Sequence, residues 1–139
     1  MSNGTLPLEG VRVIDLAQVF AGPACTRILA DLGADVIRFE AASRMDVTRN
    51  LIITDNDGID HHWHRASYFV VRNASKREMV LDLNKEDGRA IFRKLVAGAD
   101  VVVESFTPRV MANFGLGYEA LKAIKPDIIM ISLYGYGQY

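Results

Sequence analysis

The chain has 139 residues, a length typical of a single domain, and half of them are hydrophobic, which excludes wholesale disorder. Sixteen basic residues are balanced by 17 acidic ones, and the resulting net charge of −1 argues against a globally basic protein, so we expect no nucleic-acid partner. The single cysteine, Cys25, excludes an internal disulfide and favours a reducing, cytoplasmic location. No signal-peptide pattern opens the chain and no apolar run approaches the ~18 residues of a membrane span, so no membrane partner is expected.

Short apolar runs alternate with helical patterns along the chain. The predicted strands, rich in Val and Ile, are 11–17, 35–40, 78–83, 100–104 and 127–133. The predicted helices are 23–32, 85–97, 108–114 and 117–125. The first has an apolar face of Cys25, Ile28, Leu29 and Leu32, and the second has one of Ile91, Phe92, Leu95 and Val96. Asn84 is the predicted N-cap of the second helix, and Thr107 is that of the third. This alternation predicts an α/β fold, a parallel sheet with helices on both faces.

Two segments depart from this rhythm. Residues 41–75 are polar and show no sustained period, apart from a short apolar patch at 68–71, and a loop of this length is usually functional or mobile. The last predicted strand is followed by only a few residues up to Tyr139. Because a buried strand needs cover, we expect the natural protein to continue.

Three loops that follow predicted strands have an unusual composition: 18–24, 104–109 and 134–138. Ligands of open parallel sheets bind outside the carboxyl ends of the strands, and the small residues Ala21 and Gly22 would allow a close approach to the backbone. Ordinary strand-to-helix turns explain the same residues equally well.

Several familiar sites are disfavoured. The first loop has one glycine where a dinucleotide fingerprint has three, and neither a phosphate-binding P-loop nor a G-x-S-x-G nucleophile motif occurs. Neighbouring histidines at 61–64 lack a partner at ligand spacing, so no metal site is predicted. Cys25 is expected to be a buried structural thiol. The basic segment 72–77 fits either phosphate binding or a solvated loop.

Taken together and in order, several motifs resemble the start of the family III CoA-transferases, the CaiB/BaiF family. They are the residues 8–16, Ala21-Gly22-Pro23, 32–40, Asn73-Ala74-Ser75-Lys76-Arg77, Leu81-Asp82-Leu83, 99–106, 115–119 and Gly135-Tyr136-Gly137-Gln138. The resemblance covers nearly the whole chain apart from roughly residues 44–66.

This resemblance implies that residues 1–139 form the Rossmann-like, CoA-binding N-terminal part of a larger fold. CoA and acyl-CoA would be substrates, no cofactor would be needed, and the full-length protein would form a homodimer of interlinked chains. The implied CoA-contacting residues are Val19, Phe20, Ala21, Lys76, Arg77, Ser105, Phe106, Tyr134, Gly135 and Tyr136. Lys76 and Arg77 would be partners of the CoA phosphates. Ser105 departs from the Asn common at its position, and Phe20 stands where some members carry a polar residue near the thioester.

The resemblance also implies a transfer of CoA between carboxylic acids through an Asp carboxylate nucleophile. That Asp follows the Gly135–Gln138 motif in the family, beyond this chain, so no catalytic residue is assigned. Acids such as Asp15, Glu40 and Glu104 are expected to pair or to position loops. An α-methylacyl-CoA racemase of the same fold and a non-catalytic CoA-binding module remain as alternatives.

Overall fold

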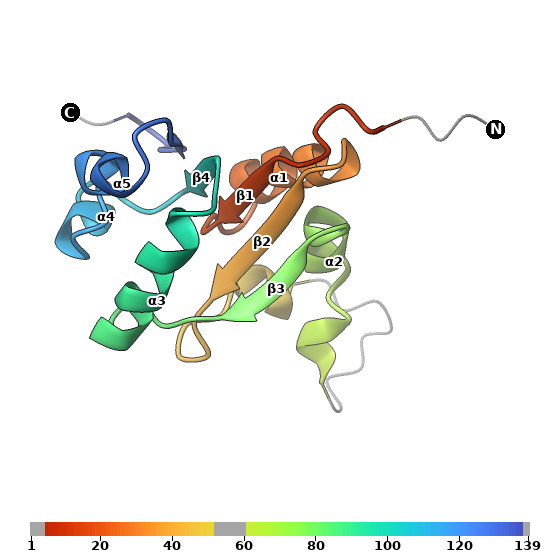
Figure 1. Cartoon of the computed structure of the whole chain (residues 1–139). Coiled ribbons are helices and arrows are strands. Elements are labelled where there is room, and N and C mark those ends of the chain that lie inside the picture. The colour runs from red at the N-terminus through yellow and green to blue at the C-terminus, as the bar shows by residue number, and fades with distance from the viewer. Residues whose placement is uncertain (1–4, 52–60, 138–139) are drawn as a thin grey trace.

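The computed structural model describes residues 5–51 and 61–137 (Figure 1). Its strands are β1 (Arg12–Asp15), β2 (Asp35–Glu40), β3 (Arg77–Val80), β4 (Val101–Glu104) and β5 (Ile129–Ser132). The helices are α1 (Ala21–Asp31), α2 (Ser67–Asn73), α3 (Glu86–Val96), α4 (Val110–Asn113) and α5 (Tyr118–Ile124), with short 3-10 turns at Val47–Asn50 and His62–His64.

All five strands pair in parallel, in the order β3-β2-β1-β4-β5. The helices that connect β1, β2 and β3 lie together on one face, where α1 contacts α2, and α3 and α5 contact each other on the other face (Figure 1). From β1 the chain adds strands toward one edge of the sheet, and from β4 it adds β5 toward the other edge. Because crossovers between parallel strands are right-handed, the two directions place their helices on opposite faces. The predicted α/β class, a Rossmann-like parallel sheet with helices on both faces, is confirmed.

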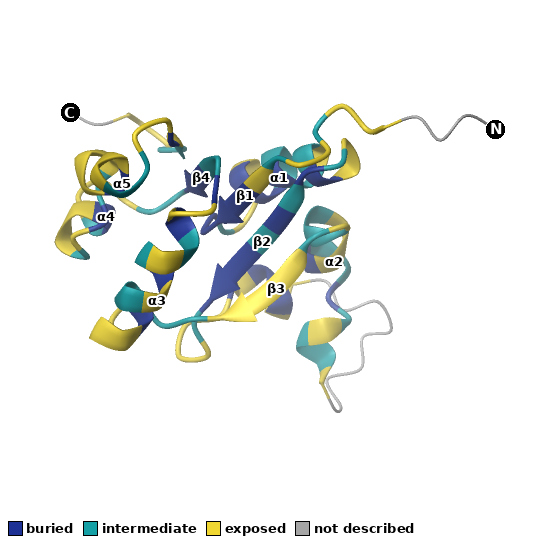
Figure 2. Cartoon of the chain, viewed as in Figure 1, coloured by how far each residue is buried: buried dark blue, intermediate teal, exposed yellow. Residues whose placement is uncertain are grey.

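Each face of the sheet has its own apolar core because successive strand residues point to opposite sides. Val13 of β1 belongs to a small cluster with Ala30 of α1, whereas its neighbour Ile14 belongs to a larger cluster with Phe92 and Val96 of α3. Each of these large side chains stabilises the fold by roughly 1.5–3 kcal/mol when fully buried. The central strands are buried, but β3 is an exposed edge strand (Figure 2).

The apolar face predicted for the first helix is wrong in part, since Leu29 packs against the core but two other members do not. Ile28 is 60% exposed and Leu32 is also exposed, whereas Gly22, Thr26 and Ala30 face the sheet. Small residues are selected here by close packing: a Cβ on Gly22 would lie 2.2 Å from the Cβ of Ala17. Hydrophobicity alone therefore misplaced the centre of the buried face of this helix.

Both predicted helix caps are also wrong. Asn84 precedes the true N-cap of α3, Lys85, and its backbone and side-chain amides instead donate to the Asp82 carboxylate in a tight turn. α4 begins after Arg109, which has a left-handed φ of 74°, so Thr107 lies in the preceding turn. In addition, β3 ends at Val80 and its last hydrogen bond to β2 is the one that the Leu81 backbone N–H donates to the Glu40 carbonyl, so residues 82–84 lie beyond the sheet.

The segment predicted as a long loop contains α2. Phe69 is the buried residue of this helix. The guanidinium of Arg49 lies 3.7 Å from the centroid of the Phe69 ring, and that of Arg38 lies 4.9 Å from it. Stacking on charged side chains and contacts with α1, rather than a repeated apolar face, hold the helix in place.

Candidate functional site

The strand order reverses between β1 and β4, and this is the point at which open α/β sheets bind ligands. The connection from β1 leads to α1 on one face, and the connection from β4 leads to α4 and α5 on the other. The two loops therefore separate at the carboxyl edge of the sheet and leave a crevice between them.

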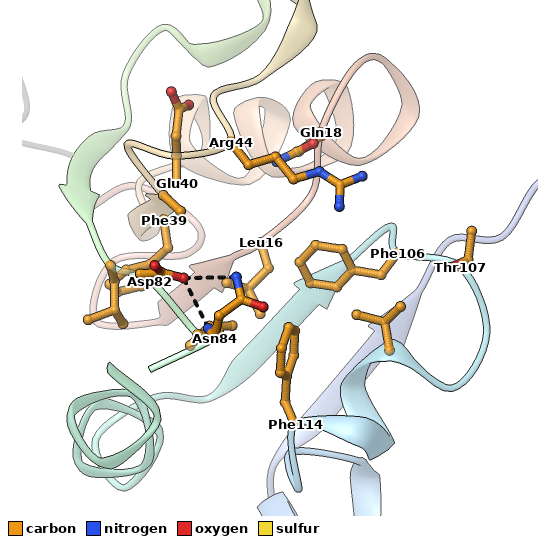
Figure 3. Close-up of a pocket in the computed structure, with 14 residues that line it drawn as sticks. Leu16, Gln18, Phe39, Glu40, Arg44, Asp82, Asn84, Phe106, Thr107 and Phe114 are labelled. Atoms are coloured by element: carbon orange, nitrogen blue, oxygen red, sulfur yellow. Dashed lines mark hydrogen bonds between the residues drawn. The ribbon is translucent and has the colours of Figure 1, made fainter. Parts of the chain in front are cut away.

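A cleft of about 190 Å³ lies at this crevice (Figure 3). It is lined by Leu16 and Gln18 after β1, by Phe39, Glu40, Ala41 and Arg44 at the end of β2, by Leu81, Asp82, Leu83 and Asn84 after β3, and by Phe106, Thr107, Val110 and Phe114 after β4. The rings of Phe106 and Phe114 form one wall, and Gln18 and Arg44 stand at one side (Figure 3). An apolar cleft with a few polar groups is the usual form of a small-molecule site.

The loop after β1 is fixed by two hydrogen bonds from distant parts of the chain. The Gln18 backbone N–H donates to Ser105 Oγ over 2.9 Å, and the Val19 backbone N–H donates to Asp46 Oδ2 over 3.1 Å. Val19 has a φ of 71°, which is a strained conformation for a β-branched residue. Such strain persists where surrounding contacts impose it, and it is common in ligand-binding loops.

Asp46 is itself held by a buried network of charges. The Arg38 guanidinium donates to Asp46 Oδ2 over 2.9 Å and pairs with Glu40, while Arg49 binds Glu40 Oε1 over 2.7 Å. Glu78 of β3 accepts from both arginines. Although burial lowers the pKa of Arg38, hydrogen bonding to Glu40 and the neighbouring carboxylates raise it overall, so this cation stays charged. The network links the edge strand to the loop after β1.

The acids predicted to position loops do so. Asp15 Oδ1 accepts the Ala17 backbone N–H over 2.9 Å, and Glu104 Oε2 accepts the Phe106 backbone N–H over 2.7 Å. The same two-residue turn therefore opens the loops on both sides of the cleft. Glu40 contributes through its two arginine partners.

Lys76, predicted as a partner of the CoA phosphates, has a buried side chain that does not line the cleft. Its ammonium donates to Asp15 Oδ2, the Pro23 carbonyl and Asn73 Oδ1, each over 2.9 Å, and its side chain is 1% exposed. Burial lowers the pKa of Lys76, partly opposed by the Asp15 charge. With three acceptors for its three protons, Lys76 connects β1, α1 and α2 and does not reach the cleft.

The remaining predicted residues lie in three places. Phe106 lines the cleft, Ser105 holds the β1 loop through Gln18, and this loop contains Val19, Phe20 and the first residue of α1, Ala21. Arg77 lies at the opposite, amino-terminal edge, where it binds the Asp35 carboxylate. Tyr134, Gly135 and Tyr136 follow β5 and do not line the cleft, and Tyr136 is 93% exposed. Gln138 lies outside the described residues.

The sequence prediction missed the floor and one wall of the cleft. Phe39, Arg44 and Phe114 were not predicted as site residues, and Leu81-Asp82-Leu83 was predicted as the last part of a strand. Asp82 and Asn84 could have indicated that the strand ends earlier, because Asp and Asn are common in tight turns.

Within 5–51 and 61–137, no three His, Cys, Asp or Glu side chains form a group that could hold a metal ion. His61, His62 and His64 instead pack around Trp63. In the same described segments, no helix is long and apolar enough to cross a membrane.

Comparisons with known proteins agree with this geometry. The sequence model of CoA-transferase family III matches residues 8–139. Over 138 residues the chain is 42% identical to a succinate–glutarate CoA-transferase of Agrobacterium fabrum, covering 99% of this chain and 34% of that protein. It is also 42% identical, over 130 residues, to a succinyl-CoA:mesaconate CoA-transferase of Haloarcula hispanica, covering 94% of this chain and 32% of the relative.

A crystal structure of a CaiB/BaiF family protein from Brucella suis superposes with a TM-score of 0.78 at 40% identity, covering 93% of this chain and 33% of that one. The chain thus spans about a third of the length of the relatives it matches. The family match over almost the whole sequence, with the strand order and the loops described above, shows that this chain belongs to CoA-transferase family III.

Proposed function

We propose that this chain binds CoA and acyl-CoA in the cleft at the point where the strand order reverses. The observation that carries the proposal is the cleft itself, whose phenylalanine wall and few polar groups suit a heterocyclic base joined to phosphates. Family membership supports CoA as the nucleotide. The adenine ring would lie against Phe106 and Phe114.

Arg44 is the proposed partner of the CoA phosphates, in place of Lys76 and Arg77. It lines the cleft, its side chain is exposed, and no ion pair occupies its guanidinium among the residues the structure describes. A guanidinium of this kind binds phosphate oxygens through paired hydrogen bonds. The fixed Gln18–Ala21 loop would then guide the rest of CoA across the edge of the sheet.

For the full-length protein we propose the transfer of CoA between carboxylic acids through a carboxylate nucleophile. Two relatives described above are named for succinate, glutarate and mesaconate, which supports dicarboxylic acids as substrates. These relatives are transferases, which favours transfer over the racemase alternative. The nucleophile is not among the residues assigned here, and CoA serves as substrate.

Location and assembly belong to the same proposal. The single cysteine supports a reducing, cytoplasmic environment. The exposed edge strand β3 supports an assembly in which another part of the protein covers it, as in the interlinked homodimer that the family resemblance implies.

Calorimetric titration of the protein with CoA tests the binding proposal. Arg44→Met should weaken CoA binding roughly tenfold because a charge-assisted phosphate contact is lost. Arg93→Met is the matched control, since Arg93 lies on α3 and pairs with Glu86 away from the cleft. Absence of binding in a folded sample, or equal affinities of wild type and Arg44→Met, would contradict the proposed site.

A further inference from the structure

A cationic side chain is held between two aromatic rings beside the β1 loop. The Arg72 guanidinium of α2 lies 4.2 Å from the centroid of Phe20 and 4.1 Å from that of Tyr68. The centroids of the two rings are 6.2 Å apart, and Phe20 is 51% exposed. The cluster Phe20–Tyr68–Arg72 therefore presents a charge at an accessible surface.

Stacking uses the faces of a guanidinium and leaves its edges free. All five N–H donors of arginine point outward in the plane of the group. In the described part of the chain none of those of Arg72 has a hydrogen-bond or ion-pair partner, and its Nε is buried without an acceptor. The terminal N–H groups of Arg72 are the donors that a ligand can use, because they have no acceptor among the described residues.

Several other arginines of the chain are held by carboxylates. Arg38 and Arg49 share three acids in the buried network, and Arg77 binds Asp35 through both terminal oxygens. Arg72 is thus oriented by its two rings rather than by an acid. An oriented guanidinium with free edge donors matches a planar carboxylate, which it binds through two parallel hydrogen bonds.

One member of the cluster, Phe20, lies on the β1 loop, which also lines the CoA cleft. Gln18 lines the cleft, and Phe20, two residues later, forms one wall of the cluster. An acyl-CoA whose nucleotide occupies the cleft and whose thioester arm crosses this loop would bring its acyl group to Arg72. The apolar faces of Phe20 and Tyr68 suit the methylene groups between the thioester and a terminal carboxylate.

We propose that Arg72 binds the free carboxylate of a dicarboxylic acyl group and so selects dicarboxylic over monocarboxylic acyl-CoA. This inference rests on the proposed binding of CoA and adds the residue that sets acyl specificity.

The test compares glutaryl-CoA with pentanoyl-CoA, which has the same number of acyl carbons without the second carboxylate, and with CoA itself. Dissociation constants are measured by calorimetry for the wild type, Arg72→Met, Arg72→Lys and the control Arg93→Met. The wild type and Arg93→Met should bind glutaryl-CoA about tenfold more tightly than pentanoyl-CoA, as expected for a charge-assisted pair. Arg72→Met should lose this preference with its CoA affinity unchanged, and Arg72→Lys should retain part of it.

The outcomes separate the two proposals. Equal affinities of the wild type for the two thioesters, or a preference that persists in Arg72→Met, would overturn the role of Arg72 while leaving CoA binding intact. The wild-type comparison decides this even when a variant does not fold. If CoA and both thioesters fail to bind the folded wild type, the CoA site itself is refuted, and the role of Arg72 with it.

Discussion

Two adjacent cations, Lys76 and Arg77, show how strongly the surroundings of a residue decide its role. The Lys76 ammonium is enclosed with Asp15, whereas the Arg77 side chain is 64% exposed and binds Asp35 at the sheet edge. The two residues are adjacent in one basic segment of the sequence. Their side chains reach different surroundings because successive side chains point in opposite directions where β3 begins. Charge could be predicted from the sequence, but burial could not.

Lys76→Met should lower the free energy of unfolding by roughly 3–5 kcal/mol, because it leaves the buried Asp15 carboxylate without its cation. Arg77→Met should change it by no more than about 1 kcal/mol, as is usual for an exposed pair, and should leave CoA affinity unchanged. Urea denaturation measures both. Equal losses of stability in the two variants would show that Lys76 is not buried with Asp15.

At the level of helices and strands, periodicity predicted where the elements lie but not how they pack. The five strands and the helices α1, α3, α4 and α5 were all expected from apolar spacing and turn residues. The buried face of α1 was not, because Gly22 and Thr26 are selected by close approach and by a hydrogen bond to Asp15, and neither is hydrophobic. The short α2 was missed because its single buried side chain, Phe69, gives no period.

Close packing also fixes one wall of the cleft. A Cβ on Gly88, in the first turn of α3, would lie 2.1 Å from the Asp82 carbonyl oxygen. The Cβ and the carbonyl oxygen are both attached directly to the backbone, so neither can rotate away. The backbone of Asp82 and its neighbours in the cleft would have to move.

Gly88→Ala should therefore destabilise the protein by about 1–3 kcal/mol through this steric conflict, although alanine normally favours a helix interior by about 1 kcal/mol. It should also weaken CoA binding. Gly98→Ala is the control, since its nearest neighbour is the end of the Arg12 side chain at 3.6 Å. Thermal unfolding compares the two, and a stabilised Gly88→Ala variant would disprove the close contact.

At the scale of the whole molecule, the site is a product of topology. The cleft takes residues from the ends of β1, β2, β3 and β4 and from α4, which are separated by up to about a hundred positions in the sequence. The α/β class, and the β1 and β4 loops as candidate ligand positions, followed from the sequence. The strand order, the contribution of Leu81–Asn84 and the position of Arg44 required the fold, because they depend on which loops meet at the carboxyl edge.

The most direct test of CoA binding at this edge is a titration of the isotope-labelled protein with CoA, followed by the backbone amide NMR spectrum. The account predicts that the largest shift changes occur at Gln18, Asn84 and Phe106, with Arg12 and Arg77 at the opposite edge unaffected. Changes centred on that opposite edge, or none in an excess of CoA, would contradict it.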